Sequence, residues 1–231
     1  LVRSLVVRDT DLPQVPEGTA VSVVLTGGAG QVHGPAQLCQ RRDLPVAGLE
    51  IALRDVDDPA GNARRVVAAV DAARGEGVLD EDTPVFVELP AGDPTYSWLT
   101  AADEVAAAEL RLKLRTGGLE PDAFPTPERL AAWIDAALDR ELPFKCTAGL
   151  HRALPHVDAD GCAHHGFLTL LAATRVAFDG GSPDDVVSTL RRDDATDLLA
   201  LDLAGARRWF TSFGSCSIDE PLADLQELVS L

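Results

Sequence analysis

The lysines of this chain are few and similarly placed. Among its 20 basic residues only Lys113 and Lys145 are lysines, and the other 18 are arginines. Lys113 lies in LKLRTGG and Lys145 in FKCTAGLH, so a threonine and a glycine follow each lysine within a few residues. A lysine can lose its proton and attack a carbonyl carbon to form a Schiff base, whereas the pKa of arginine is too high for this reaction. The two segments are therefore candidates for imine chemistry.

This chemistry requires an amine without its proton. An amine that is held near another cation and away from water loses its proton more easily. If the two segments are neighbouring strands whose lysines face the same interior, Lys113 and Lys145 meet there. The alternative is structural: the two lysines are survivors of an arginine-rich composition, or one of them pairs with a carboxylate such as that of Glu88.

Histidines form a second group. Four of the five fall within one short stretch: His151, His156, His164 and His165. Further thiols and carboxylates lie close to them in the sequence: Cys146, Asp158, Asp160 and Cys162. These are ligand types for zinc or iron, but the spacing H-x4-H-x7-H-H is typical of no standard site, and a solvated loop explains it equally well. We predict no metal ion and favour proton transfer by His151 or His165, because a neutral imidazole titrates near physiological pH.

Two arginines, one serine and one cysteine have weaker signals. Arg54 and Arg115 end predicted strands and could bind a carboxylate or phosphate in forked geometry, or could form ion pairs. Ser215 and Cys216 are nucleophile types, but GSCSI lacks the GxSxG elbow, and the sequence implies no partner base.

Strands and helices alternate along the chain. Apolar runs predict strands over 1–7, 20–26, 48–55, 84–90, 110–118, 143–150 and 210–218. Helical spacing and N-terminal capping residues such as Thr126 and Ser182 predict helices over 62–77, 98–109, 126–141, 165–178, 182–193 and 219–228. This alternation implies right-handed crossovers and a parallel sheet.

The predicted fold is a single α/β domain over residues 1–231, of the (β/α)₈ TIM-barrel type. Seven strands are one short of that barrel, and we expect the first strand to precede Leu1. A doubly wound open sheet is the competing architecture, but GGAGQVHG (27–34) lacks the GxGxxG spacing of a nucleotide-binding turn. In a barrel the active site lies at the carboxyl ends of the strands, where both lysine segments end.

Charge and composition exclude some partners. With 20 basic and 37 acidic residues the formal net charge is −17, which repels nucleic acids and anionic membranes. The chain has no apolar run of roughly 18 residues and no recognisable signal peptide. Its four widely spaced cysteines are typical of reduced thiols in a cytoplasmic protein.

Three motifs resemble an uncharacterised family of bacterial proteins with KxTAGLH, HGFL and FGSCS segments. They are Lys145–His151, His165–Leu168 and Phe213–Ser217. This resemblance brings no activity with it.

More distantly, the chain resembles the class I deoxyribose-phosphate aldolases, which are TIM barrels. KLRTGG looks like the segment of their Schiff-base lysine, KCTAGLH like that of the second lysine that lowers its pKa, and FGSCS like their phosphate-binding turn. The resemblance implies Lys113 as the Schiff-base amine and Lys145 as its electrostatic neighbour. Our candidate substrate-binding residues are Arg54, Arg115, Thr147, Gly214 and Ser215.

The chain departs from that family in two places. LEIALRD has Ala52 where the family has a relay aspartate, so Glu50, Asp55 or Glu88 would have to replace it. Asp219 and Glu220 follow the FGSCS turn and disfavour a phosphate, although amides at a helix N-terminus attract one.

The sequence therefore predicts a lyase-type enzyme that acts on a small carbonyl compound through a lysine Schiff base. It needs no organic cofactor, and His151, His165 or Glu88 would move protons. We expect no nucleic-acid or membrane partner, while a homo-oligomer is compatible with the sequence. The alternatives are a metal-dependent lyase or hydrolase built on the loop from His151 to His165, and a non-catalytic ligand-binding barrel.

Overall fold

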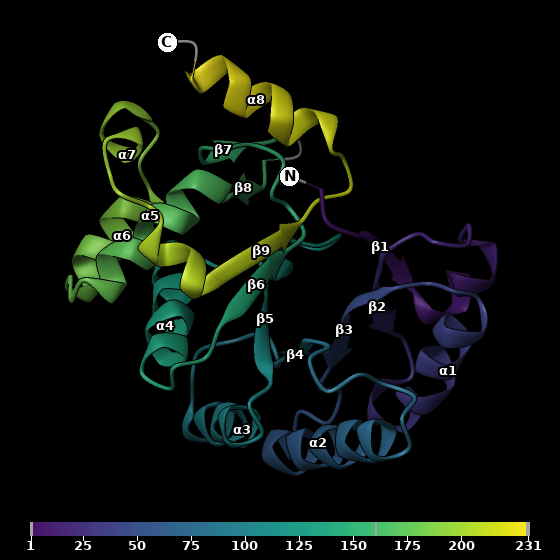
Figure 1. Ribbon diagram of the computed structural model, residues 1–231. Helices are drawn as coiled ribbons and strands as arrows, with labels where there is room; N and C mark the ends of the chain where they lie inside the picture. Colours follow the sequence, from purple (N-terminus) through teal and green to yellow (C-terminus); the bar gives the residue numbers. More distant parts are fainter. Residues whose placement is uncertain (1, 160, 230–231) are drawn as a thin grey trace. The chain divides into compact units, whose positions relative to one another are not determined.

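The computed structural model describes residues 2–159 and 161–229 (Figure 1). Its main sheet is all-parallel with the strand order β1-β2-β3-β4-β5-β6-β9, and helices alternate with these strands along the chain. Two compact units divide the chain. The first holds the residues up to Pro90 and Thr95–Lys113, and the second holds Ala91–Pro94 and the residues from Leu114 onward.

The first unit contains the strands in chain order. They are β1 (Leu5–Arg8), β2 (Val21–Leu25), β3 (Val46–Ala52), β4 (Val85–Glu88) and the beginning of β5 (Arg111–Arg115). Its helices are α1 (His33–Arg41), α2 (Pro59–Gly75) and α3 (Tyr96–Ala107), with 3₁₀ turns at Asp9–Gln14 and Gly28–Gln31. A doubly wound sheet reverses its strand order at a switch point. The sequential order excludes that alternative for this unit.

Burial on both faces explains the continuous apolar runs of these strands. In β3 four consecutive residues, from Gly48 to Ile51, are buried, as expected for a parallel strand that is covered on both sides. The side chain of Asp58 caps α2 by accepting from the amide of Gly61 at 2.8 Å. Helices α2 and α3 pack side by side (Figure 1), and Arg64 and Glu104 join them in an ion pair of 2.7 Å.

The second unit continues the parallel pattern. It contains the end of β5, β6 (Phe144–Thr147) and β9 (Phe210–Gly214), and an antiparallel hairpin of β7 (His156–Val157) and β8 (Ala163–His164). Its helices are α4 (Pro127–Leu138), α5 (Phe167–Phe178), α6 (Pro183–Leu190), α7 (Thr196–Leu199) and α8 (Asp219–Val229), with 3₁₀ turns at Pro121–Ala123 and Gly205–Arg208.

The capping residues that the sequence marked begin their helices as expected. Thr126 accepts from the amide of Arg129 at 3.3 Å at the start of α4, and Ser182 forms a capping box with Asp185 at the start of α6. The parallel α/β fold and its alternating elements are thus confirmed, with strands shorter than predicted. A closed barrel and a single domain stay predictions. No helix among the residues described is both long enough and apolar enough to cross a bilayer.

Candidate functional site

Strand register in the first unit aligns three residues in one row. Lys113 on β5 pairs with Glu88 on β4, and Glu88 pairs with Ala52 on β3. Glu50 lies two residues before Ala52, so its side chain leaves β3 on the same face. The aldolase resemblance requires an acid at the position of Ala52. Two carboxylates lie next to that position in the sheet: Glu88 is the register partner of Ala52, and Glu50 precedes it by two residues on the same strand.

A buried ion triad results. The Nζ of Lys113 lies 2.8 Å from Oε2 of Glu50 and 2.9 Å from Oε2 of Glu88. The side chains of Lys113 and Glu50 are 9% and 1% exposed, and that of Glu88 is 16% exposed. One ammonium therefore faces two carboxylates in a site that is nearly closed to water. Such a group binds and moves protons more readily than it binds an anion.

The pKa of Lys113 is raised above its usual value. Burial by itself lowers this pKa, but the charges of Glu50 and Glu88 and the hydrogen bonds with them outweigh it. This direction is opposite to the one expected for a pair of lysines. The amine in the first unit is therefore an ammonium at rest, and a reaction that needs the free amine must first move its proton to a carboxylate.

Asp55 and Arg54 are used elsewhere in the first unit. Asp55 pairs with Arg65 at 2.9 Å and accepts from the amide of Asp58 at 3.1 Å. The guanidinium of Arg54 donates to the carbonyl oxygen of Thr26. Of the three acids expected to replace the relay aspartate, Glu50 and Glu88 contact the amine and Asp55 forms other contacts.

Lys145 lies in the second unit. It is 4% exposed on β6, where its register partner is Ser212 on β9. Lys113 belongs to the first unit, so a cavity shared by the two amines stays a prediction. The neighbouring Cys146 is fully buried, and burial raises the pKa of its thiol.

The two similar segments TGG and TAG pack together in the second unit. The hydroxyl of Thr116 donates to the carbonyl oxygen of Ala148 at 2.7 Å. The backbone amide of Thr116 donates to the carbonyl oxygen of Thr147 at 2.9 Å. Ala148 and Gly149 both have left-handed backbones, with φ of 70° and 75°. A Cβ on Gly117 would approach the backbone of Gly149 to 3.1 Å, a tight contact that favours glycine at this position. The sequence did not identify this role of Thr116.

The arginine and turn candidates of the second unit also have partners. Arg115 donates from Nε to the carbonyl oxygen of Gly117 at 2.9 Å. Gly214 ends β9 opposite Thr147, and the hydroxyl of Ser215 accepts from the amide of Ser217 at 3.3 Å. These contacts shape the loops after β5, β6 and β9. Whether Arg115, Thr147, Gly214 or Ser215 binds substrate stays a prediction.

The β7–β8 hairpin brings two of the histidines together. His156 and His164 are register partners, and their rings stack with centroids 4.8 Å apart. His164 contacts the carbonyl oxygen of Gly149 through Nδ1 and the carboxylate of Asp158 through Nε2, each at 3.0 Å. Both partners are oxygen atoms that accept hydrogen bonds. Burial and the nearby charge of His164 lower the pKa of His156.

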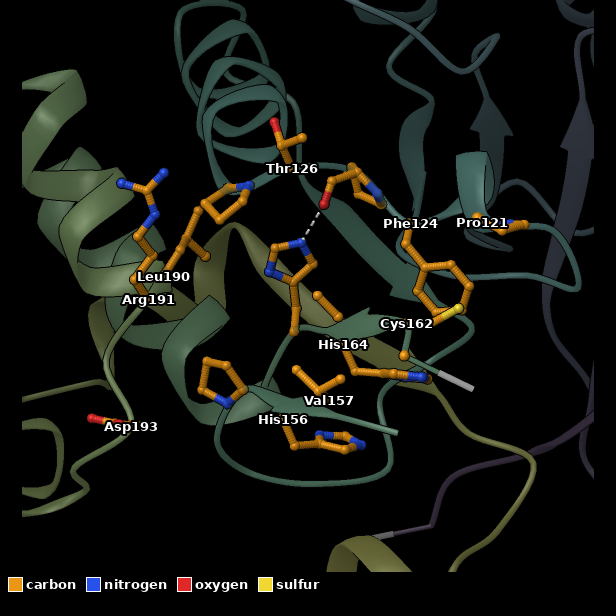
Figure 2. Close-up of a pocket in the computed structure, with 16 residues that line it drawn as sticks. Pro121, Phe124, Thr126, His156, Val157, Cys162, His164, Leu190, Arg191 and Asp193 are labelled. Carbon is orange, nitrogen blue, oxygen red and sulfur yellow. Dashed lines mark hydrogen bonds between the residues drawn. The ribbon is translucent and has the colours of Figure 1, made fainter. Parts of the chain in front are cut away.

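A pocket of about 690 Å³ lies beside this hairpin (Figure 2). Its lining includes Phe124, Val157, Leu190 and both stacked histidines, and His165 also reaches it. His165 is 5% exposed and donates from Nε2 to the carbonyl oxygen of Pro125 at 2.7 Å. Burial lowers the pKa of His165, so this ring stays neutral and keeps Nδ1 as an acceptor.

His151 has different partners from the two stacked histidines of the hairpin. Its Nδ1 contacts Oε2 of Glu220 at 2.8 Å, and the sulfur of Cys216 is close to the same ring. Within residues 2–159 and 161–229 no group of three or more histidine, cysteine or acidic side chains is arranged to hold a metal ion. Asp160, which the sequence placed among the possible ligands, is outside the described residues.

Comparisons of this chain with protein-family models, with curated proteins and with solved structures found no match.

Proposed function

We propose that this chain is a lyase-type enzyme that cleaves or forms a carbon–carbon bond in a small carbonyl compound through an imine on Lys113. The observation that carries the proposal is the buried amine with two carboxylates within 2.9 Å. It supplies a nucleophile and its proton acceptors in one place, on strands β3, β4 and β5 of the parallel sheet. The role of Lys145 as the electrostatic neighbour of Lys113 stays a prediction.

The carboxylates give each step a route for its proton. The ammonium of Lys113 passes one proton to Glu50 or Glu88, and the neutral amine adds to the carbonyl carbon. The hydroxyl of the resulting carbinolamine takes that proton back and leaves as water. The iminium then accepts the electron pair of the breaking carbon–carbon bond, while the hydroxyl of the departing fragment gives its proton to a carboxylate and becomes a carbonyl. The resulting enamine takes that proton at carbon, and water hydrolyses the imine to release the product and free the amine. Among the three expected proton carriers, Glu88 is favoured because it contacts the amine.

The proposed substrate is a small molecule, and its proposed reaction needs no organic cofactor. It is a small aldehyde or ketone, and nucleic acids and membranes are not partners of a chain with net charge −17. We propose a cytoplasmic enzyme, with a homo-oligomer compatible with the sequence.

Reductive trapping tests this proposal. The protein is treated with borohydride and a panel of short aldehydes and ketones, and labelled residues are mapped by mass spectrometry. We expect an adduct on Lys113 that forms faster as the pH rises, because the raised pKa keeps the resting amine protonated. The adduct should be absent from Lys113→Arg and slower to form in Glu88→Gln.

A matched control removes a carboxylate elsewhere. Glu104→Gln alters the exposed pair with Arg64 and should trap like the parent protein. The proposal is wrong if no carbonyl compound labels Lys113, or if Glu88→Gln and Glu104→Gln trap at the same rate as the parent.

A non-catalytic ligand-binding protein is the second candidate, because a lysine that is fully ion-paired also serves a purely structural purpose. In that case ligands occupy the pocket beside the β7–β8 hairpin, and no carbonyl compound is trapped. A thermal-shift screen that finds a stabilising ligand for a protein with Lys113→Arg would favour this candidate.

A further inference from the structure

The parallel pairing of β6 and β9 brings two loops together in the second unit. Thr147 at the end of β6 is the register partner of Gly214 at the end of β9. His151 follows β6 by four residues and Cys216 follows β9 by two, so neighbouring loops carry them. Figure 1 shows the chain running from β9 directly into α8, whose first turn contains Glu220. Three residues from two loops and one helix thus converge.

Helix α8 is anchored where it carries Glu220. The carboxylate of Asp224 accepts from the amide of Ala153 at 2.6 Å, which ties the helix to the segment after His151. Leu225 and Leu228 on the same helix pack against the buried cluster around Ala153. The contact between Glu220 and His151 is therefore supported by a second polar contact and by apolar packing.

The contacts form an ordered series from carboxylate to imidazole to thiol. Oε2 of Glu220 lies 2.8 Å from Nδ1 of His151, and the sulfur of Cys216 lies 3.8 Å from Nε2 and 4.0 Å from Nδ1 of the same ring. An Nδ1–H that donates to the carboxylate leaves the lone pair on Nε2. The sulfur is almost equally distant from both nitrogens, so the Cys216 side chain must turn toward Nε2 before that lone pair accepts the thiol proton.

We propose that Cys216, His151 and Glu220 form a cysteine nucleophile site for acyl transfer from small activated esters or thioesters. His151 removes the thiol proton, and the sulfur bonds to the carbonyl carbon while the bond to the leaving oxygen or sulfur breaks. The proton on His151 passes to the leaving group. Water, deprotonated by His151, then cleaves the thioester and restores the thiol. This site requires neither lysine, so it is independent of the proposed imine chemistry.

Exposure and surroundings separate Cys216 from two of the other thiols. Cys216 is exposed, whereas Cys39 and Cys146 are buried and inaccessible to a substrate. Cys162 is partly exposed and lies in the hairpin, where its amide donates to Asp158. The ring of His151 is 27% exposed, so an acyl group can approach the sulfur and the base from solvent.

Acylation by p-nitrophenyl acetate tests the site. We expect a burst of nitrophenolate and one acetyl group on Cys216 by peptide mass spectrometry. Cys216→Ser should lose the burst, and His151→Gln should slow it about 100-fold, the usual contribution of a general base. Added imidazole should restore part of the rate in His151→Gln, which a merely structural defect would not allow. Cys162→Ser should react like the parent protein.

Glu220 is a positioning residue, and its test has a second readout. In the parent protein the long-range proton–nitrogen NMR spectrum should show His151 protonated at Nδ1, and Glu220→Gln should change this spectrum and slow acylation. Glu227→Gln removes the same charge from the same helix and should alter neither. Acetylation of another residue instead of Cys216, or an unchanged rate in His151→Gln, would overturn the proposal.

Discussion

At the scale of single residues, the surroundings of an ionisable group decide its charge. Lys113 shows this most clearly: the sequence indicated an amine made acidic by a second lysine, but carboxylates contact it and raise its pKa. The sequence named Lys113, Glu50 and Glu88 one by one. It could not give their contacts, because these depend on strand register and on the rotamers of three long side chains.

Removing the amine of this triad should cost much of the protein's stability. Lys113→Met removes the ammonium that the carboxylates of Glu50 and Glu88 both contact, and we expect a loss of about 3–5 kcal/mol in the free energy of unfolding. Arg64→Met breaks only the partly exposed pair with Glu104 and should lose at most about 1 kcal/mol. Urea denaturation measures both, and equal losses would contradict this account of the triad.

His165 makes the stability depend on pH. Its pKa is lowered in the folded protein by burial, so the unfolded chain binds more protons below a pH of about 6.5. Stability should therefore fall as the pH drops below that value, by at most about 1.4 kcal/mol per pH unit for this one group. His156, whose pKa is also lowered, acts in the same sense.

Denaturation between pH 5 and 7, at about one-unit intervals around the histidine pKa, checks this. His165→Gln retains a donor for the carbonyl oxygen of Pro125 but cannot titrate, so its stability should depend less on pH. A slope equal to that of the parent protein would show that His165 does not contribute.

At the scale of elements, the spacing of apolar residues and the helix caps predicted the main strands and most long helices. They missed several shorter elements. The seven main strands and the helices that follow most of them were readable from apolar runs and from caps such as Thr126 and Ser182. Helix α1 was missed because it directly follows a glycine-rich stretch. The β7–β8 hairpin was missed because strands of two residues carry no period.

Close backbone packing at the start of α5 gives a prediction at this scale. A Cβ on Gly166 would lie 2.2 Å from the carbonyl oxygen of Ala153 and 2.5 Å from Cα of Leu154, both backbone atoms. Gly166→Ala should therefore force the chain apart and lower the melting temperature. Gly75→Ala, in helix α2, meets no atom within 4 Å and should stabilise the protein by up to about 1 kcal/mol. Melting curves that shift in the same direction would contradict this contrast.

At the scale of the whole molecule, excess negative charge acts on stability rather than on fold. With 37 acidic and 20 basic residues, most of the repulsion lies between exposed carboxylates. The parallel α/β fold was predictable because it depends on apolar period, which this charge does not alter. Closure of a barrel was not predictable in this way, because closure requires the first and last strands of the sheet to pair with each other.

Salt should stabilise this protein. Raising the ionic strength from low values to about 0.15 M shortens the screening length to about 8 Å and weakens the repulsion between exposed carboxylates. We expect the melting temperature to rise with sodium chloride, and most steeply at low concentrations. A melting temperature that falls with salt would indicate that exposed ion pairs such as that of Arg64 and Glu104 outweigh the repulsion.

The two lysines are both buried, with 8% and 4% of Lys113 and Lys145 exposed. In the native state the chain thus offers bulky amine-directed reagents almost no side-chain target. Unlike a small carbonyl substrate, acylating dyes and lysine-specific cross-linkers should mark these positions only when the surrounding strands open. The rate at which Lys113 or Lys145 becomes modified would therefore measure the rate at which the units that contain them open.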